Sequence, residues 1–153
     1  RIPSVGARLT GISDSMVADA PDFEEVAEPL AQCLAGSVFV AHNAPFDWGF
    51  VHGELTAATG EELVMDRLCT VRLARRLVPE LRRRNLDSLS QHFDVMIQGR
   101  HRAYGDALAT AQVFLRLLDL ARDRGVRDLA GLQHMINSRG RARPPAKEET
   151  QSP

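Results

Sequence analysis

Short apolar runs alternate with helical patterns along most of the chain. Apolar residues at 37–41, several of them β-branched, predict a strand buried on both faces, and 63–65 predicts a second, shorter strand. Apolar positions at helical spacing predict helices over 23–34, 45–59, 70–78, 86–93, 103–124 and 126–136. A further helix is expected after Ser13, a typical N-cap residue. Pro29 should kink the 23–34 helix or end it early. This order of elements indicates a three-layer α/β domain.

The apolar periodicity ends near residue 137. A chain of 153 residues suits one domain. We therefore expect a single domain over 1–137 and a disordered basic tail or linker over 138–153. Two strands are too few for a stable sheet, and the chain begins at Arg1 without an initiator Met. The first strands of the sheet are therefore expected to lie before residue 1.

The composition is that of a globular protein, with 44% hydrophobic and 25% charged residues. These values exclude wholesale disorder and a disulfide scaffold. Two distant cysteines suit reduced thiols, and no apolar run is long enough to span a membrane, so we expect a cytoplasmic protein without a membrane partner. The first 66 residues contain eleven acidic and two basic side chains, whereas the remainder is basic. This division suggests an acidic pole for metal ions and a basic pole for a polyanion, unless surface charge segregated by chance.

Two short segments concentrate residues that can carry chemistry. HNAPFDWGF, at 42–50, follows the first predicted strand, and HRAYGDA, at 101–107, begins the longest predicted helix. Each places an aspartate, Asp47 or Asp106, in the first turn of a helix. Taken alone, either aspartate could simply be favoured by the helix dipole.

Taken together, the two segments indicate a metal-dependent site. Ligands of open α/β sheets bind at the carboxyl ends of strands, where two aspartates can share a hard cation. His101 has a side chain suited to accept a proton near neutral pH. Carboxylates without a cysteine pair at zinc spacing favour Mg²⁺ or Mn²⁺. Two metal ions that promote phosphoryl transfer would need more carboxylates than Asp47 and Asp106.

The ordered motifs resemble those of the DEDDh 3′–5′ exonucleases, the family of the proofreading epsilon subunit of bacterial DNA polymerase III. HNAPFDWGF is similar to the second motif of that family, and HRAYGDA matches the third. LTGISDSMVADAP (9–21), CTVRLARRLVP (69–79) and NLDSLSQHF (85–93) resemble the family's intervening stretches. The resemblance implies a ribonuclease H-like three-layer fold. It also implies that Asp47 and Asp106 bind two divalent metal ions, Mg²⁺ or Mn²⁺, and that His101 is the general base.

The family's first motif, Asp-x-Glu on a strand, has no counterpart in these 153 residues. By the resemblance, it should precede Arg1 and supply two carboxylates that contact both metal ions. We therefore expect the parent protein to be an active exonuclease and the isolated chain to be weak or inactive.

The resemblance implies release of nucleotides from the 3′ end of single-stranded or frayed DNA, with proofreading as one role. We expect His42, Asn43, Phe46 and Phe50 to contact this substrate. Arginines at 72–76, 82–84 and 139–143 could follow its phosphates or form an ordinary solvated surface.

The expected protein partner is a DNA polymerase or a domain fused after residue 138. Two alternatives remain open at this point. One is a 3′ exoribonuclease of the same family. The other is a catalytically silent module that binds nucleic acid or a polymerase.

Overall fold

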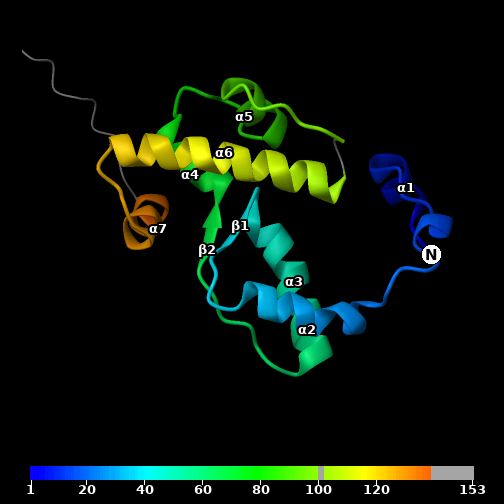
Figure 1. The fold of residues 1–153 in the computed structure, drawn as a ribbon. Coiled ribbons are helices and arrows are strands. Elements are labelled where there is room, and N and C mark those ends of the chain that lie inside the picture. Colours follow the sequence, from blue (N-terminus) through cyan, green and yellow to red (C-terminus); the bar gives the residue numbers. More distant parts are fainter. Residues whose placement is uncertain (100–101, 139–153) are drawn as a thin grey trace, which may run out of the picture.

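Helices lie on both sides of a small parallel sheet (Figure 1). The computed structural model describes residues 1–99 and 102–138. Strand β1 (Phe39–Ala41) pairs in parallel with β2 (Arg67–Cys69), so that Val40 lies opposite Leu68. Parallel strands need a crossover connection, and α3 (Ala44–Thr59) supplies it. The α/β class predicted from the sequence is confirmed.

Most of the remaining helices, though not the first, lie where the sequence predicts them. The Asn85 side chain caps its helix by accepting from the Ser88 amide at 2.9 Å, and Asp128 caps the last helix through the Gly131 amide at 2.7 Å. These helices are α1 (Ser4–Thr10), α2 (Phe23–Leu34), α4 (Thr70–Leu77), α5 (Leu86–His92), α6 (Ala103–Asp123) and α7 (Leu129–Asn137).

The second strand begins later than the apolar pattern suggests. Val64, in the middle of the predicted strand, is 84% exposed, whereas Leu68 and Cys69 are buried. Residues 63–66 form part of the connection from α3, and the strand starts where side chains reach the core. The prediction of a strand at 63–65 is therefore wrong.

Two local expectations near the N-terminus also need correction. Helix α2 continues through Pro29 to Leu34, so no early break occurs there. One proline removes a single helical hydrogen bond, and the packing of α2 against α3 supports the remaining turns. After Ser13 the chain makes only a 3₁₀ turn, Asp14–Met16, and the preceding helix α1 was not predicted.

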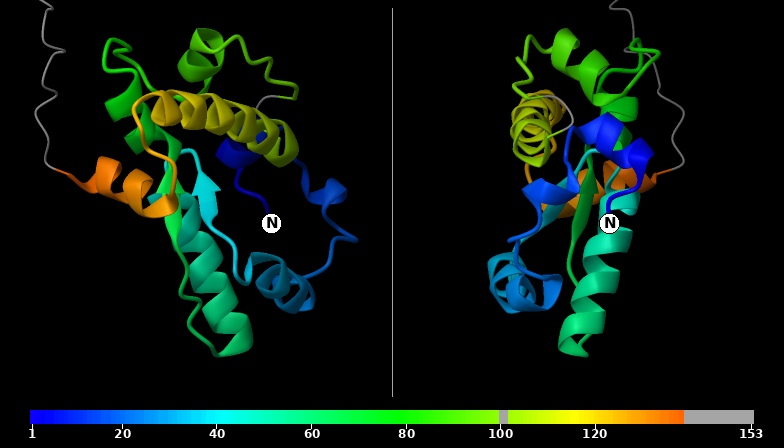
Figure 2. Two further views of the ribbon diagram at one scale, coloured as in Figure 1. Left: turned by 60° about the vertical axis from the view of Figure 1, so that its left-hand side comes forward. Right: turned by 90° about the vertical axis from the view of Figure 1, so that its right-hand side faces the viewer.

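The sheet separates two layers of helices (Figure 2). Phe39 faces α3, where its ring lies 5.3 Å from that of Trp48. Val40 and Leu68 face the opposite layer and line a pocket with Phe114 of α6. The main core lies on that second side, where each buried leucine contributes about 1.5–3 kcal/mol. Its fully buried side chains include Leu73, Leu89, Val113 and Leu117.

Several arginines hold the carboxyl ends of helices. Arg124 donates to the carbonyl oxygens of Arg76 and Leu77, at 2.5 and 2.8 Å, at the end of α4. Arg84 donates to the Pro79 carbonyl at 3.0 Å, and Arg76 donates to the Ser138 carbonyl beyond α7. Arg76 and Arg84, for which the sequence left a phosphate track and a solvated surface open, thus bind carbonyls just beyond the ends of α7 and α4.

Of the expected tail, only Ser138 lies within the described residues. The arginines at 139–143 lie outside them. Within residues 1–99 and 102–138, no helix is long and apolar enough to cross a bilayer.

Candidate functional site

A groove of about 840 Å³ runs along the outer edge of β1, between α3 and α6. It follows all three residues of the strand and opens at the carboxyl end, where His42 lies. This is the edge of an open α/β sheet where ligands usually bind. Its lining is apolar apart from a few polar side chains: His42, Asp47, Asp106 and Thr110.

Asp47 and Asp106 both line this groove, although they are far apart in the sequence. Asp47 lies in the first turn of α3 and Asp106 in the first turn of α6, and both are half-buried. The crossover helix and the longest helix begin on either side of the edge of β1, so their first turns bring the two carboxylates to one cavity. The structure thus brings together the two aspartates singled out as metal ligands.

His42 is connected to the second strand through a buried hydroxyl. Its Nδ1 atom lies 2.9 Å from Oγ1 of Thr70, the first residue of α4, which is fully buried. The contact joins the carboxyl end of β1 to that of β2. Sequence reasoning did not single out Thr70, because its only signal is its position directly after a strand.

Asn43 makes the turn from β1 into α3. Its φ of 69° lies in the left-handed region, and its carbonyl accepts from the Phe46 amide at 2.9 Å. Among residues with a side chain, asparagine and aspartate are two that tolerate this conformation well. The turn therefore gives Asn43 a structural role whether or not its amide contacts a substrate.

Phe46 and Phe50 form an exposed aromatic pair beside the groove. Their rings pack edge to face with centroids 5.1 Å apart, and the residues are 63% and 61% exposed. They share one face of α3, whereas Asp47 and Val51, one residue further on, line the groove itself. The pair thus flanks the cavity and is not part of its lining.

The segment that leads into α6 approaches the helix very closely. A Cβ atom added at Gly105 would lie well inside the contact distance of the Gln98 carbonyl oxygen and 2.9 Å from that of Gly99. Glycine is therefore required directly before Asp106. His101, the expected general base, lies in this segment but outside the described residues.

The alanine ridge of α6 faces the groove. Ala103, Ala107 and Ala111 line the cavity and are exposed. Helix α6 reaches the core through another face, formed by Ala109, Val113, Leu117 and Ala121. The ridge leaves room for a further element beside β1.

The donor set of the groove suits a hard divalent cation. Carboxylate oxygens such as those of Asp47 and Asp106 are the ligands that Mg²⁺ and Mn²⁺ prefer. In the described part of the chain, no cluster of three or more histidine, cysteine or acidic side chains could hold a metal ion. The two aspartates therefore suit such a cation as two of its ligands.

These features define an α/β domain with two aspartates in one groove at the carboxyl end of a parallel strand. Residues 1–114 match the family model RNase_T, described as an exonuclease. The chain belongs to this exonuclease family, and the resemblance to DEDDh exonucleases of the epsilon type is confirmed.

Curated relatives carry related names. The chain is 36% identical over 140 residues to a PolC-type DNA polymerase III of Caldanaerobacter subterraneus, a match covering 90% of the chain and 10% of the polymerase. It is 40% identical over 121 residues to the 3′-5′ exonuclease DinG of Bacillus subtilis, covering 79% of the chain and 13% of DinG. It is 34% identical over 144 residues to a DNA polymerase III subunit epsilon-like protein of Rhodobacter capsulatus, covering 92% of the chain and 20% of that protein. The chain thus spans a fifth or less of these relatives.

Proposed function

We propose that the protein is a metal-dependent 3′–5′ exonuclease that removes nucleotides from the 3′ end of single-stranded or frayed DNA. The observation that carries this proposal is the meeting of Asp47 and Asp106 in one groove at the carboxyl end of β1. Membership of the exonuclease family and the relative named 3′-5′ exonuclease DinG support it. DNA is preferred over RNA because the relatives include DNA polymerases.

In this proposal the residues of the two motifs and His42 have separate roles. Asp47 and Asp106 would hold two Mg²⁺ or Mn²⁺ ions, which supply charge stabilisation for the phosphoryl oxygens and lower the pKa of bound water. His101, five residues before Asp106, would accept the proton of the attacking water. His42, fixed against Thr70 at 2.9 Å, would orient the 3′-terminal nucleotide in the groove.

We also propose that a further strand, supplied by a segment outside these 153 residues, pairs with the outer edge of β1. The Phe39 amide donates to the Asp66 carbonyl, so Phe39 and Ala41 direct their backbone groups toward β2. The backbone groups of successive strand residues point to opposite edges, so the N–H and C=O groups of Val40 point toward the groove. The exposed alanine ridge leaves space for such a strand, and its carboxylates would complete the metal site.

Phe46 and Phe50 would contact the bases next to the cleaved bond. Exposed aromatic rings beside an acidic groove can stack on successive bases, at about 1–3 kcal/mol per base, with little preference for sequence. Asn43 lies at the start of the same helix, and its amide could reach the terminal sugar or phosphate. A polymerase or a fused domain following residue 138 would deliver the 3′ end, in a cytoplasmic replication or repair setting without membrane contact.

A degradation assay tests the proposal. DNA and RNA strands labelled at the 5′ end are incubated with the complete parent protein and with the 153-residue chain, in Mg²⁺ or Mn²⁺. We expect the parent protein to shorten DNA stepwise from the 3′ end, and the isolated chain to be weak or inactive. Faster degradation of RNA would favour the exoribonuclease, and an inactive parent protein would favour the silent binding module.

The variants Asp47→Asn and Asp106→Asn locate the site within the parent protein. Each should raise the metal concentration needed for half-maximal activity by at least about tenfold, or 1.4 kcal/mol. Asp119→Asn is the matched control, because Asp119 is exposed on α6 and pairs only with Arg122 among the described residues. His101→Ala should lower turnover by about 10²–10⁴. If the metal dependence is unchanged in both variants, Asp47 and Asp106 are not metal ligands.

A further inference from the structure

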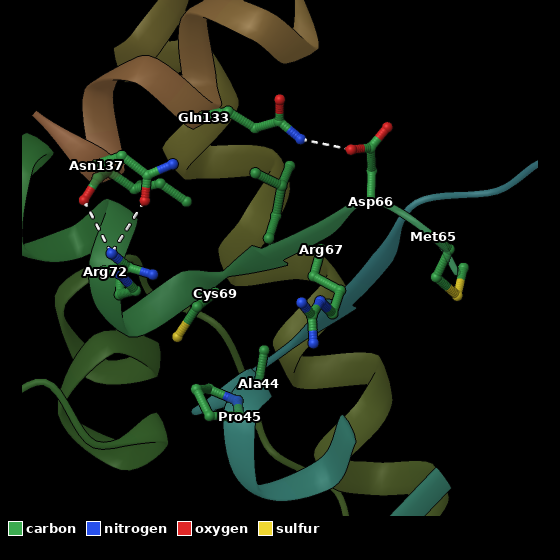
Figure 3. Close-up of a pocket in the computed structure, with 11 residues that line it drawn as sticks. Ala44, Pro45, Met65, Asp66, Arg67, Cys69, Arg72, Gln133 and Asn137 are labelled. Atoms are coloured by element: carbon green, nitrogen blue, oxygen red, sulfur yellow. Dashed lines mark hydrogen bonds between the residues drawn. The ribbon is translucent and has the colours of Figure 1, made fainter. Parts of the chain in front are cut away.

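A second pocket, of about 370 Å³, lies at the opposite edge of the sheet from the groove, along the outer edge of β2 (Figure 3). Its walls come from the first turn of α3, from β2 and the residues before it, and from α7. Two arginines, Arg67 of β2 and Arg72 of α4, are among its lining side chains. The pocket thus contains two basic side chains and borders α3, the helix that carries Asp47 of the candidate active site.

Arg67 is held in a defined position. Its guanidinium carbon lies 5.0 Å from the centre of the Trp48 ring, a cation–π arrangement. Stacking fixes the plane of the guanidinium while leaving the N–H groups along its edge available for a planar or tetrahedral anion. Arg67 is itself exposed, so an anion can reach it from solvent.

Arg72 is oriented by uncharged acceptors. Its Nη2 atom donates to the Ile136 carbonyl at 3.3 Å and to Oδ1 of Asn137 at 3.1 Å, both at the end of α7 (Figure 3). Both bonds use one nitrogen, Nη2, so the other N–H groups of the guanidinium are left for a ligand in the pocket. They also leave its positive charge without a neutralising carboxylate.

The acidic side chain of this pocket has another partner. Oδ1 of Asp66 accepts from Nε2 of Gln133 at 2.7 Å. Across residues 1–99 and 102–138, neither Arg67 nor Arg72 forms an ion pair with a carboxylate. Each of these guanidinium groups is oriented and lacks a counter-charge, so each can offer N–H donors to a phosphate group.

The first turn of α3 connects this pocket to the acidic groove. Ala44 and Pro45 line the β2 pocket, whereas Asp47 lines the groove along β1. We infer that Arg67 and Arg72 each contact a backbone phosphate of the nucleic-acid strand, several nucleotides from the 3′ end that lies in the groove. This inference rests on the proposed nuclease function and adds a subsite that makes the enzyme sensitive to substrate length.

The test compares short and long DNA in the complete parent protein. Arg67→Gln and Arg72→Gln are assayed on a dinucleotide and on a twelve-nucleotide strand. For the long strand, each variant should raise KM about five- to tenfold with kcat unchanged, because a charge-assisted contact is lost. For the dinucleotide, which cannot reach the pocket, both constants should stay as in the unmodified protein.

Salt dependence gives a second readout. The slope of log KM for the long strand against log salt should become shallower by about 0.7 for each lost phosphate contact. Arg116→Gln serves as the matched control, because Arg116 is exposed on α6 and lines neither pocket. This control should leave both the KM values and the salt slope unchanged.

Arg72 also holds the end of α7, so thermal unfolding is measured for every variant. A variant that acts only through the fold would lower the melting temperature and affect both substrates equally. Equal kinetics of Arg67→Gln and unmodified protein on the long strand would overturn the inference, as would an unchanged salt slope. That result would favour another occupant, such as an acidic peptide. Failure of the unmodified protein to degrade any DNA would instead refute the proposed function.

Discussion

His42 and Thr70 are joined by a hydrogen bond of 2.9 Å between the imidazole Nδ1 and the buried hydroxyl. The bond links the carboxyl ends of the two strands, and His42 itself lines the acidic groove. It also selects the direction in which the imidazole presents its other nitrogen, Nε2. Thr70 is therefore a positioning residue for His42 in the proposed function.

Replacing Thr70 by valine should loosen His42 while preserving the packing volume. Thr70→Val removes a buried hydroxyl, and the unfolding free energy should fall by about 1 kcal/mol. Exonuclease kcat should fall with it, whereas Thr70→Ser, which keeps the hydroxyl, should restore most of the activity. Activity and denaturant unfolding, measured side by side, check this; equal kcat for the serine and valine variants would show that the hydroxyl does not act through His42.

Two variants of Asn43 separate its structural role in the turn from its proposed contact with the substrate. Asn43→Ala places a less tolerant residue at φ 69° and should lower stability by about 1–2 kcal/mol. Asn43→Gly suits the left-handed turn but lacks the amide, so stability should stay near that of the unmodified protein. If the glycine variant keeps full exonuclease activity, the amide does not contact the substrate.

Gly105 should be intolerant of even one methyl group. In Gly105→Ala, the new Cβ would clash with the Gln98 carbonyl, and the segment before Asp106 would have to move. We expect a loss of about 1–3 kcal/mol of stability together with reduced activity. Gly53→Ala is the control, because nothing lies within 4 Å of its added Cβ; at this exposed position of α3 it should be neutral or stabilising by about 0.5–1 kcal/mol. Thermal unfolding compares the two variants.

Arg124 should stabilise the fold although it is far from the site. Arg124→Gln removes the donors to the Arg76 and Leu77 carbonyls at the end of α4. The unfolding free energy should fall by about 1–2 kcal/mol. Arg127→Gln, a change at an exposed arginine nearby, should alter it by less than about 0.5 kcal/mol. Denaturant titration at low and high salt measures both; equal stability of the two variants would mean that water satisfies those carbonyls equally well.

Local signals predicted most of the helices and both motif positions. The helix predicted over 86–93 begins at Leu86 as expected, and the Asn85 side chain caps it, which is a local interaction. The second strand was misplaced, because 63–65 and 67–69 are both short and apolar in part, and only burial distinguishes exposed Val64 from buried Leu68. Whether a short segment joins a sheet depends on its partners, which are distant in sequence.

For the site, the sequence located the aspartates but not what surrounds them. Asp47 and Asp106 were identified by motif spacing, and the structure brings them to one groove. Thr70 and Arg67 could not be found in this way, because their importance comes from contacts with His42 and Trp48 across the fold. The spacing of Ala103, Ala107 and Ala111 shows that they share one face of α6, but it does not show that this face lines the groove.

The arginine contacts at the end of α7 determine where this domain can be cut or transplanted. The family match ends at residue 114, in the middle of α6, yet Arg72 and Arg76 bond to residues 136–138. A version trimmed at the family boundary would lose half of α6 and all of α7, and would uncover Leu73 and Leu77 in the core. An expression boundary, or a graft of this domain onto another protein, must therefore retain the chain through Ser138.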